Sequence, residues 1–374
     1  MRFERFFPVL AAIGLWTAAC GAPRLRPENE ISLSFPLVEA SRVNCRSPLM
    51  PAITAGPGGL VLVETRNGYL QALDPEQATI RWSIFLGAAA SEPVVVGDRI
   101  VWAISNGWIF GLDEAGQEAW RLEINEPVFG ELRVVGGRVV FLNEKDFLTA
   151  LNPADGAIVW RIPVPSAAKW TADGERIILR TSDNRLRIFE SDGRPTGDFA
   201  IEGKAAGDFG IVDNFAVLGF ADGRLAAYDL TTGEKRWSQH LGGVPVGPPV
   251  SDGRNIYVVL SSQIVAALQL KRGELLWWKA LSGRAAFSPR LIGSYALVSS
   301  RSPRLQAFLA KDGEAEVAFE AGGEILAPPE MIGSKILLVI NAETEDQDVF
   351  VSLHASPPAP PESPEKTDAT EIKK

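Results

Sequence analysis

Apolar and polar residues alternate over short stretches of this chain, and residues typical of turns separate the stretches. Gly223–Trp237 (GRLAAYDLTTGEKRW) shows the unit most clearly. Its first half alternates as a β-strand does, with successive side chains on opposite faces. Asp229–Gly233 then supplies a turn, because glycine tolerates a left-handed backbone and an aspartate side chain can accept bonds from turn amides. A second strand reaching Trp237 completes a predicted hairpin.

This hairpin recurs along most of the chain. Clear copies begin at Gly68, Gly107, Asp146 and Ser261, weaker copies at Asn184 and Pro303, and a single strand at Asp348. The position of Asp229 is occupied in turn by Asp74, Asp113, Asn152, Glu190, Asp229, Gln269, Leu309 and His354. Subtraction gives steps of 39, 39, 38, 39, 40, 40 and 45 residues. A period near 40 with about four short strands per repeat indicates a β-propeller. The sequence therefore predicts an all-β fold, with one eight-bladed β-propeller over residues 31–354.

The two ends of the repeat array predict how the ring closes. Ile31–Val38 (ISLSFPLV) is patterned as a strand but has no earlier strand to pair with, and the last repeat ends one strand short after Val349–His354. Pairing these two segments would complete blade eight and remove two sheet edges that could otherwise recruit other chains. We therefore predict closure of the ring by this N-terminal strand. The alternative is a strand that lies outside the ring.

A tryptophan ends most of the clear repeats, namely Trp82, Trp120, Trp160, Trp237 and Trp277. Such a row of rings could line a ligand site, or each ring could cover the face of the next blade. One ring per blade at a fixed offset favours packing between blades. Phe199 and Phe319 stand near the equivalent positions of blades four and seven, where we expect the same contact with less buried area.

The N-terminal residues 1–19 are predicted to be a signal peptide. Arg2 and Arg5 form a basic start, and the apolar run Phe6–Trp16 is too short to span a bilayer. Small residues then precede Cys20. This arrangement resembles a bacterial lipoprotein signal, so lipidation is predicted at Cys20. The alternative is an ordinary secretory signal that is cut near Ala19.

The segments on either side of the propeller are polar. Residues 20–30 are predicted to be a lipidated tether. Residues 355–374 are rich in proline and charge and have almost nothing to bury, so a disordered tail is predicted there.

Composition narrows the possible partners and cofactors. The chain has 37 Lys and Arg against 46 Asp and Glu, a net charge of −9, so nucleic acid is not an expected partner. With Cys20 lipidated, Cys45 has no second cysteine to pair with, and no disulfide is expected. His240 and His354 are the only histidines, too few for a histidine-rich metal centre. We expect no metal and no cofactor.

The pattern A-x-D-x-x-x-G-x-x-x-W, seen best in AAYDLTTGEKRW and TALNPADGAIVW, resembles the repeats of pyrroloquinoline-quinone (PQQ)-like propellers. A lipoprotein of this length with eight such repeats and nothing else is similar to the accessory lipoproteins of outer-membrane β-barrel assembly. That resemblance implies a lipid-anchored protein on the periplasmic face of the bacterial outer membrane, with a barrel-assembly protein as partner. Those relatives dock through a loop containing Leu-Arg-Gly. This sequence has none, so their docking surface does not carry over.

The same repeat occurs in enzymes, receptors and scaffolds, so fold alone does not give the function. The resemblance to quinone-dependent dehydrogenases implies adjacent cysteines against the quinone and a calcium site, but this chain has no adjacent cysteines. We see no catalytic residues and expect a non-catalytic, monomeric docking scaffold. The alternatives are a cell-envelope ligand-binding or receptor propeller and, third, a quinone-dependent dehydrogenase.

Candidate partner contacts are loops where the repeat departs from its average. One is the acidic link Asn341–Asp348 (NAETEDQD), where the spacing stretches to 45 residues. It contributes Glu343, Glu345, Asp346 and Asp348. The other is Glu39–Pro48 around Cys45, which contributes Arg42 and Arg46. The alternative for both is an ordinary solvated loop.

Overall fold

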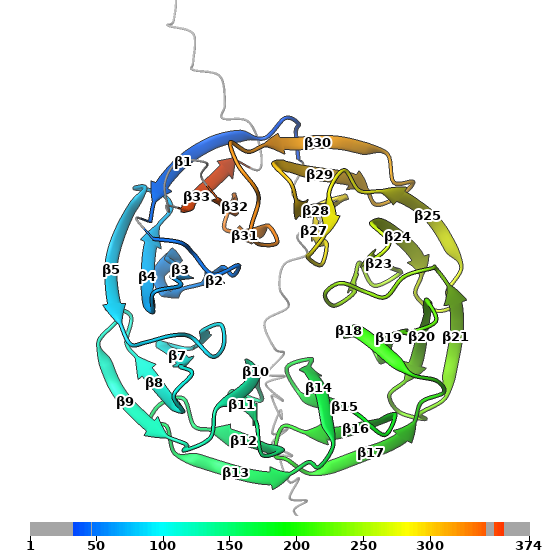
Figure 1. Cartoon of the computed structure of the whole chain (residues 1–374), viewed down its shortest axis with the longest axis horizontal. Helices are drawn as coiled ribbons and strands as arrows, with labels where there is room; N and C mark the ends of the chain where they lie inside the picture. Colours follow the sequence, from blue (N-terminus) through cyan, green and yellow to red (C-terminus); the bar gives the residue numbers. More distant parts are fainter. Residues whose placement is uncertain (1–32, 46, 342–347, 355–374) are drawn as a thin grey trace, which may run out of the picture.

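The computed structural model describes residues 33–45, 47–341 and 348–354, which form eight antiparallel sheets arranged as blades around a central axis (Figure 1). The predicted all-β, eight-bladed propeller is confirmed. Seven blades have four strands, and in blade seven the inner strand is split into two short pieces that both pair with β28. A short 3₁₀ turn, η2 (Pro57–Gly59), lies in blade one. No helix within the described residues is long and apolar enough to cross a membrane.

Each blade runs from the central axis to the rim, and its strands follow one another outward. Blades one to four contain β2 (Thr54–Ala55), β3 (Val61–Glu64), β4 (Tyr69–Asp74) and β5 (Thr79–Phe85); β6 (Val94–Val96), β7 (Arg99–Ala103), β8 (Trp108–Leu112) and β9 (Glu118–Glu123); β10 (Val128–Val135), β11 (Arg138–Asn143), β12 (Phe147–Leu151) and β13 (Ile158–Pro163); β14 (Ala167–Ala172), β15 (Arg176–Thr181), β16 (Arg185–Glu190) and β17 (Pro195–Ala200).

Blades five to eight follow the same order, except that the rim strand of blade eight comes from the N-terminal end. They contain β18 (Ala205–Val212), β19 (Phe215–Phe220), β20 (Arg224–Asp229) and β21 (Lys235–His240); β22 (Val250–Ser251), β23 (Asn255–Leu260), β24 (Ile264–Gln269) and β25 (Leu275–Ala280); β26 (Arg284–Ala285), β27 (Arg290–Ile292), β28 (Tyr295–Arg301), β29 (Arg304–Leu309) and β30 (Ala315–Glu320); β31 (Glu330–Ile332), β32 (Lys335–Asn341), β33 (Asp348–His354) and β1 (Val38–Asn44).

The middle strands of each blade are buried on both faces because neighbouring blades stack against them. β23, for example, is apolar along almost its whole length and has five buried residues out of six, as a strand covered on both sides requires. The rim strand β25 is instead largely exposed. The apolar core of the described residues is therefore a ring of eight clusters, one at each contact between neighbouring blades. We call each such contact a seam.

The repeated tryptophan packs on the next blade, as predicted. Trp237 Nε1 donates a hydrogen bond of 2.6 Å to the backbone oxygen of Leu270, and a side chain at Gly273 would approach the indole ring to 2.5 Å. Glycine is therefore required there by the close approach as well as by its φ of +71°. Bonds from the indole to the next blade are also made by Trp82, Trp120, Trp160 and Trp277. In blade four, the ring of Phe199 lies against Gly233 in the same way.

The N-terminal chain completes blade eight, but not with the predicted residues. β1 pairs antiparallel with β33, from Val38 opposite His354 to Asn44 opposite Val349. The prediction of Ile31–Val38 as the closing strand is therefore wrong, since β1 begins where that segment ends.

The residues before β1 have a different role. Leu33 and Leu37 are buried at the seam between blades seven and eight, and the Leu37 amide donates to the Ala318 oxygen at 2.8 Å. Pro36 has no amide hydrogen and cannot take part in a strand ladder as a donor. Rim strands are exposed on one face, so a strand of alternating polar residues such as VEASRVN suits the rim of blade eight. The segment with Leu33 and Leu37 is more apolar and suits a buried place between blades.

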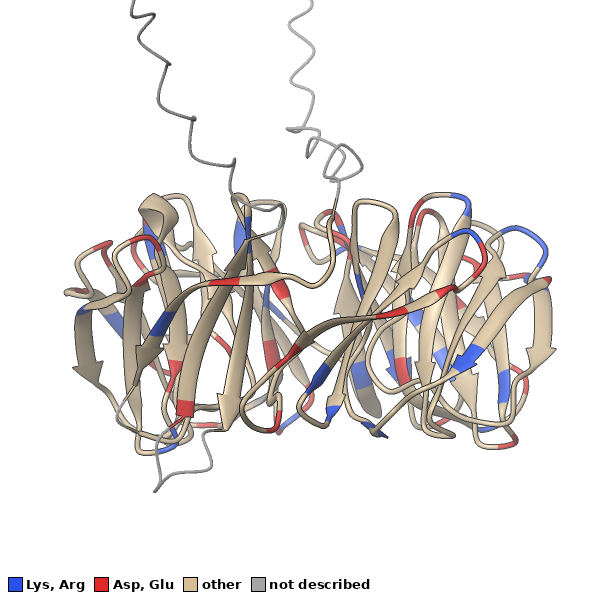
Figure 2. Ribbon diagram, turned by 90° about the horizontal axis from the view of Figure 1, so that it is seen from above, with Lys and Arg blue, Asp and Glu red and all other residues tan. Residues whose placement is uncertain are grey.

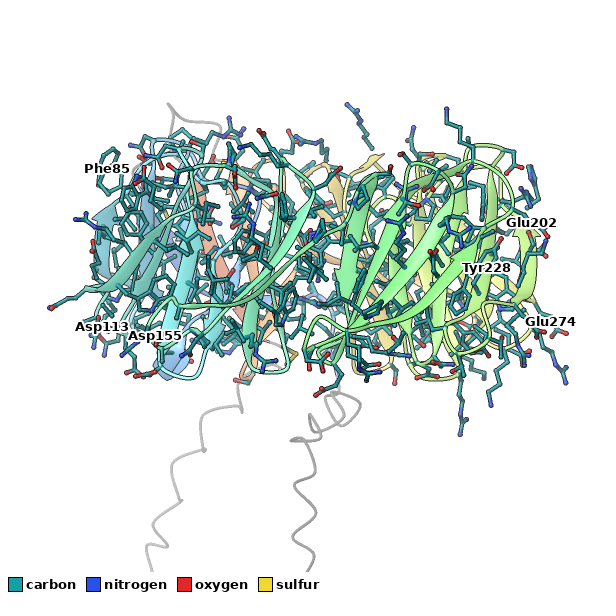
Figure 3. All side chains as sticks on the ribbon, turned by 90° about the horizontal axis from the view of Figure 1, so that it is seen from below. Phe85, Asp113, Asp155, Glu202, Tyr228 and Glu274 are labelled. Atoms are coloured by element: carbon teal, nitrogen blue, oxygen red, sulfur yellow. The ribbon has the colours of Figure 1, made fainter. Side chains whose placement is uncertain are left out.

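The two faces of the disc carry different connections. The turn face carries the turns between third and fourth strands, such as Asp113–Gln117, and the link face carries the links between blades, such as Gly87–Pro93. Figure 3 shows Asp113, Asp155 and Glu274 toward one face and Phe85 and Glu202 toward the other. Figure 2 views the disc edge-on and shows acidic and basic residues spread over both faces. Because Val38 pairs with His354, the described chain enters and leaves the propeller at the turn face.

Candidate functional site

The inner strands and the links before them enclose a central cavity of about 530 Å³, to which all eight blades contribute. Its wall combines aromatic side chains (Trp170, Phe209 and Phe287) with charged ones (Glu92, Glu131, Arg133, Lys169, Asp208 and Glu330). A volume of this size falls in the range of small-molecule sites, roughly 300–1,000 Å³.

Five of the six charged side chains of the cavity wall form ion pairs, which join neighbouring blades except for that between Arg133 and Glu131 within β10. Lys169 forms an ion pair with Asp208, whose second carboxylate oxygen accepts a hydrogen bond of 2.9 Å from the Gly247 amide. Arg290 pairs in the same way with Glu330. Sequence reasoning missed these residues, although a signal exists: opposite charges stand one repeat apart, since 208 − 169 is 39 and 330 − 290 is 40.

Glu92 is the exception, because its neighbour one repeat later is another carboxylate, Glu131. Burial among the neighbouring residues raises the pKa of Glu92 to about 7, and the negative charges of Glu131 and Glu330 raise it further, although the side chain is partly open to the cavity. Glu64 lies nearby at the end of β3 and is only 2% exposed. Burial raises its pKa to about 8, and its Oε1 has no hydrogen-bond partner among the described residues. Both carboxyls can therefore exchange protons near neutral pH.

The acidic link of blade eight is described only at its end. Glu343, Glu345 and Asp346 lie outside the described residues, as do Cys20 and Arg46. Asp348 is not in a solvated loop, and that part of the prediction is wrong. It begins β33, is 4% exposed, and accepts a hydrogen bond of 2.6 Å from the Leu49 amide. This bond satisfies a buried donor, so Asp348 serves the fold.

The second predicted contact loop is mostly a strand, because Glu39–Asn44 belongs to β1. Arg42 Nη2 forms an ion pair of 2.7 Å with Glu39, and its Nε donates to the same carboxylate at 2.9 Å. This bidentate bond raises the pKa of Arg42 and lowers that of Glu39. The loop interpretation is corrected, while the partner-contact role of the exposed Arg42 stays a prediction.

Metal-ligating and nucleophilic groups are sparse in the described part of the chain. No group of three or more His, Cys, Asp or Glu side chains there is placed to hold a metal ion. Cys45 is 1% exposed, and burial raises the pKa of its thiol to about 12, which keeps it protonated and weakly nucleophilic.

Comparison with protein families identifies the repeat. The family described as "Outer membrane protein assembly factor BamB" matches residues 105–313 and 221–345, together more than half of the chain. This chain belongs to the BamB family. The predicted PQQ-like repeat and its similarity to barrel-assembly lipoproteins are thereby confirmed at the level of the family.

Individual BamB proteins are distant relatives of this chain. BamB of Yersinia pestis is 31% identical over 157 residues, which cover 37% of this chain and 40% of that protein. BamB of Moranella endobia is 25% identical over 315 residues, or 74% of this chain and 80% of that protein. The aligned region thus spans less than half of the first relative and most of the second.

Solved structures with the same fold include BamB and an enzyme. The crystal structure of BamB from Moraxella catarrhalis has a TM-score of 0.68 at 18% identity and covers 85% of this chain and 99% of that chain. Quinohemoprotein alcohol dehydrogenase from Comamonas testosteroni has a TM-score of 0.66 at 12% identity, and the match covers 91% of this chain and 79% of that chain. At these identities the likeness shows the fold alone.

Proposed function

We propose that this chain is a non-catalytic docking scaffold, anchored by lipid at Cys20 on the periplasmic face of the outer membrane, that assists the assembly of β-barrel proteins. The match of the BamB family model to residues 105–345 carries this proposal, because that family is described as an assembly factor.

The geometry of the ring supports a scaffold. A buried cluster at every described seam makes the disc stiff, and its loops gather on two broad faces, which suits the display of a surface. The chain enters at the turn face, beside His354. A tether over residues 20–30 would therefore hold the turn face toward the membrane and leave the link face open to the periplasm.

Deletion of the gene in its host tests the function. A barrel-assembly accessory predicts lower levels of folded outer-membrane barrels and greater sensitivity to large antibiotics. Restoring the wild-type gene should reverse both effects. Normal barrel levels in the deletion strain would contradict the proposal.

The anchor is tested separately by labelling with radioactive palmitate. Wild-type protein should take up label and fractionate with outer membrane, and Cys20→Ala should abolish both. Cys45→Ala is the matched control, since it removes the other cysteine and should leave labelling unchanged. Wild-type protein recovered unlabelled and soluble would contradict the anchor.

The cavity of about 530 Å³ favours a ligand-binding propeller of the cell envelope as a second candidate function. Mass spectrometry of small molecules released from protein purified from its host distinguishes the two. A stoichiometric ligand would support the second candidate. Under the scaffold proposal none is released, and incubation with pyrroloquinoline quinone, Ca²⁺ and an alcohol gives no oxidation.

A further inference from the structure

The rim strands of blades three and six are equivalent in the repeat but differ in the side chain that follows the packing tryptophan. β13 has the sequence IVWRIP and β25 the sequence LLWWKA, with the packing tryptophan at the third position of each. Both strands expose two aliphatic side chains before that tryptophan. Ile158 and Val159 are 48% and 46% exposed, and Leu275 and Leu276 are 40% and 47% exposed.

The residue after the packing tryptophan distinguishes the two strands. In β13 it is Arg161, whose guanidinium binds Glu126 at 2.9 Å and lies 4.3 Å from the centre of the Phe147 ring. In β25 it is Trp278, which is 57% exposed. The equivalent residues of blades one, two, four and five are polar or charged, namely Ser83, Arg121, Asp198 and Ser238.

The outer edge of β25 is also open for pairing. β25 pairs with β24 on one side and with no described strand on the other. Natural edge strands usually carry charges that discourage pairing with another chain. The single charged residue of β25, Lys279, shares a face with Trp277 and lies near Gly313 of the next blade, so it does not shield this edge.

Basic residues lie at one end of this apolar edge, near the turn that precedes β25, although the chain as a whole is acidic. Lys271 and Arg272 precede β25, and Arg236 stands on β21 next to Trp237, which packs against Gly273. Arg272 has Glu274 at 3.7 Å, and Figure 3 shows Glu274 at the rim of the disc. Lys271 and Arg236 are exposed and form no ion pair with the described residues. The edge therefore complements an apolar segment with an acidic end.

We propose that the free edge of β25 binds one extended β-strand of a partner protein, whose apolar side chains contact Leu276 and Trp278 and whose acidic end meets Lys271 and Arg236. Strand addition of this kind takes its affinity from backbone hydrogen bonds and its specificity from alternate side chains. The exposed large apolar side chains of β25 are only Leu275, Leu276 and Trp278, whereas a stable contact between two copies involves roughly 20–30 residues on each side. The edge thus suits a single strand better than a second copy of this chain.

A fluorescein-labelled peptide tests this proposal. The peptide alternates Phe and Val with Thr and carries two Asp at each end, and fluorescence anisotropy measures its binding to the purified propeller. We expect saturable binding in the micromolar range, typical of small transient interfaces. Leu276→Thr combined with Trp278→Thr should weaken binding at least tenfold. Trp278→Arg places at this position the residue that β13 has in Arg161, and it should also weaken binding at least tenfold. This variant serves as the second test if the double threonine variant does not fold.

The matched control is Ile158→Thr with Val159→Thr on β13, which removes an equally exposed aliphatic pair and should leave binding unchanged. Two altered peptides sharpen the result. Lys in place of the terminal Asp should weaken binding at least tenfold, and methylation of alternate backbone amides should abolish it.

Several outcomes would overturn the proposal. They are no binding at millimolar peptide, equal loss in the β13 control, or self-association of the propeller that Trp278→Arg abolishes. The inference rests on the docking function proposed above but is measured without the assembly machinery. Failure of peptide binding therefore leaves the gene-deletion result intact, and a normal deletion strain leaves the peptide result intact.

Discussion

The seam between blades eight and one closes the ring, and it differs from the seam between blades five and six. At both seams a backbone oxygen just after the turn position accepts a hydrogen bond from the preceding blade, but the donor is different. At the seam between blades five and six, Trp237 donates to the oxygen of Leu270, the residue after the turn position Gln269. At the closing seam the equivalent oxygen belongs to Pro75, which follows Asp74. It accepts bonds of 3.0 Å from Ser41 Oγ and from Lys335 Nζ.

The closing seam is therefore polar at the position where five other seams have a tryptophan. Lys335 is 7% exposed and reaches Glu76 at 2.8 Å, and the hydroxyls of Ser41 and Ser352 are 2.6 Å apart. Burial of an indole tolerates small shifts, whereas hydrogen bonds depend on direction and distance. We infer that the polar contacts fix the register of β1, whose partner strand lies some 300 residues away, while at five other seams a tryptophan adds its buried ring to the aliphatic cluster.

The largest effect is expected from removal of the closing strand. Deletion of residues 38–44 exposes the edge of β33 and uncovers Phe350, which is fully buried. Loss of the buried Val43 side chain, of the cover over Phe350 and of the strand pairing with β33 should cost at least ~5 kcal/mol of unfolding free energy and promote aggregation. Calorimetry and light scattering measure both. Deletion of residues 355–374 is the control and should change neither. An unaltered melting temperature after deletion of 38–44 would show that β1 does not close the ring.

The next largest loss of unfolding free energy is expected when a packing tryptophan is truncated. Trp237→Ala removes the ring over Gly273 and its bond to Leu270, at a cost of ~3–5 kcal/mol in urea unfolding. Trp237→Phe should cost about 1–2 kcal/mol, mainly the lost hydrogen bond, because Phe199, two residues beyond the equivalent position in blade four, shows that a phenyl ring can cover the glycine of the next blade. Equal losses for the two variants would contradict the role assigned to ring area.

Glu64 is a buried ionisable side chain whose Oε1 has no hydrogen-bond partner among the described residues. Its pKa of about 8 in the folded protein lies above the unfolded value of about 4.5. The folded state thus binds the proton more tightly than the unfolded state does. The contribution of Glu64 to the unfolding free energy is fully present below pH ~4.5 and is lost as the pH rises through 8. The unfolding free energy of Glu64→Gln relative to that of the wild type should therefore rise by ~2–4 kcal/mol between pH 5 and pH 9. Unfolding curves at both pH values measure the gain, and a constant difference would contradict the assignment.

A smaller loss is expected when the polar closing seam is opened at Lys335. Lys335→Met keeps most of the side-chain stem but removes the bonds to Pro75 and Glu76, so ~1–3 kcal/mol should be lost. Glu76→Gln is the control, since Glu76 is 75% exposed and a surface pair contributes below about 1 kcal/mol. Should Glu76→Gln prove as costly as Lys335→Met, the ion pair and not the bond to Pro75 would dominate.

The contrast between seams also shows what the sequence could predict. The blades were predictable because each tryptophan and the glycine that it covers stand about one repeat apart, so the signal recurs along the chain. The closing strand was misplaced because VEASRVN has the polar alternation of a rim strand, which single-sequence patterns do not separate from a loop. Leu33 and Leu37 carried the stronger apolar signal, yet they fill a seam.

The candidate sites were harder to predict than the fold. Asp348 lay next to an acidic run and was interpreted as part of it, but its carboxylate caps a buried amide that only the closed ring brings near. Trp278 is visible in the sequence as a second tryptophan after Trp277. Its exposure becomes evident only when the strand register places it on the outer side of the rim.

Affinity purification of the full chain from detergent-solubilised membranes of its host, followed by mass spectrometry, tests the docking function most directly. The account predicts that the wild-type protein co-purifies with a large outer-membrane barrel protein that carries periplasmic domains. Recovery of folded, membrane-bound protein without any barrel-assembly component would contradict it.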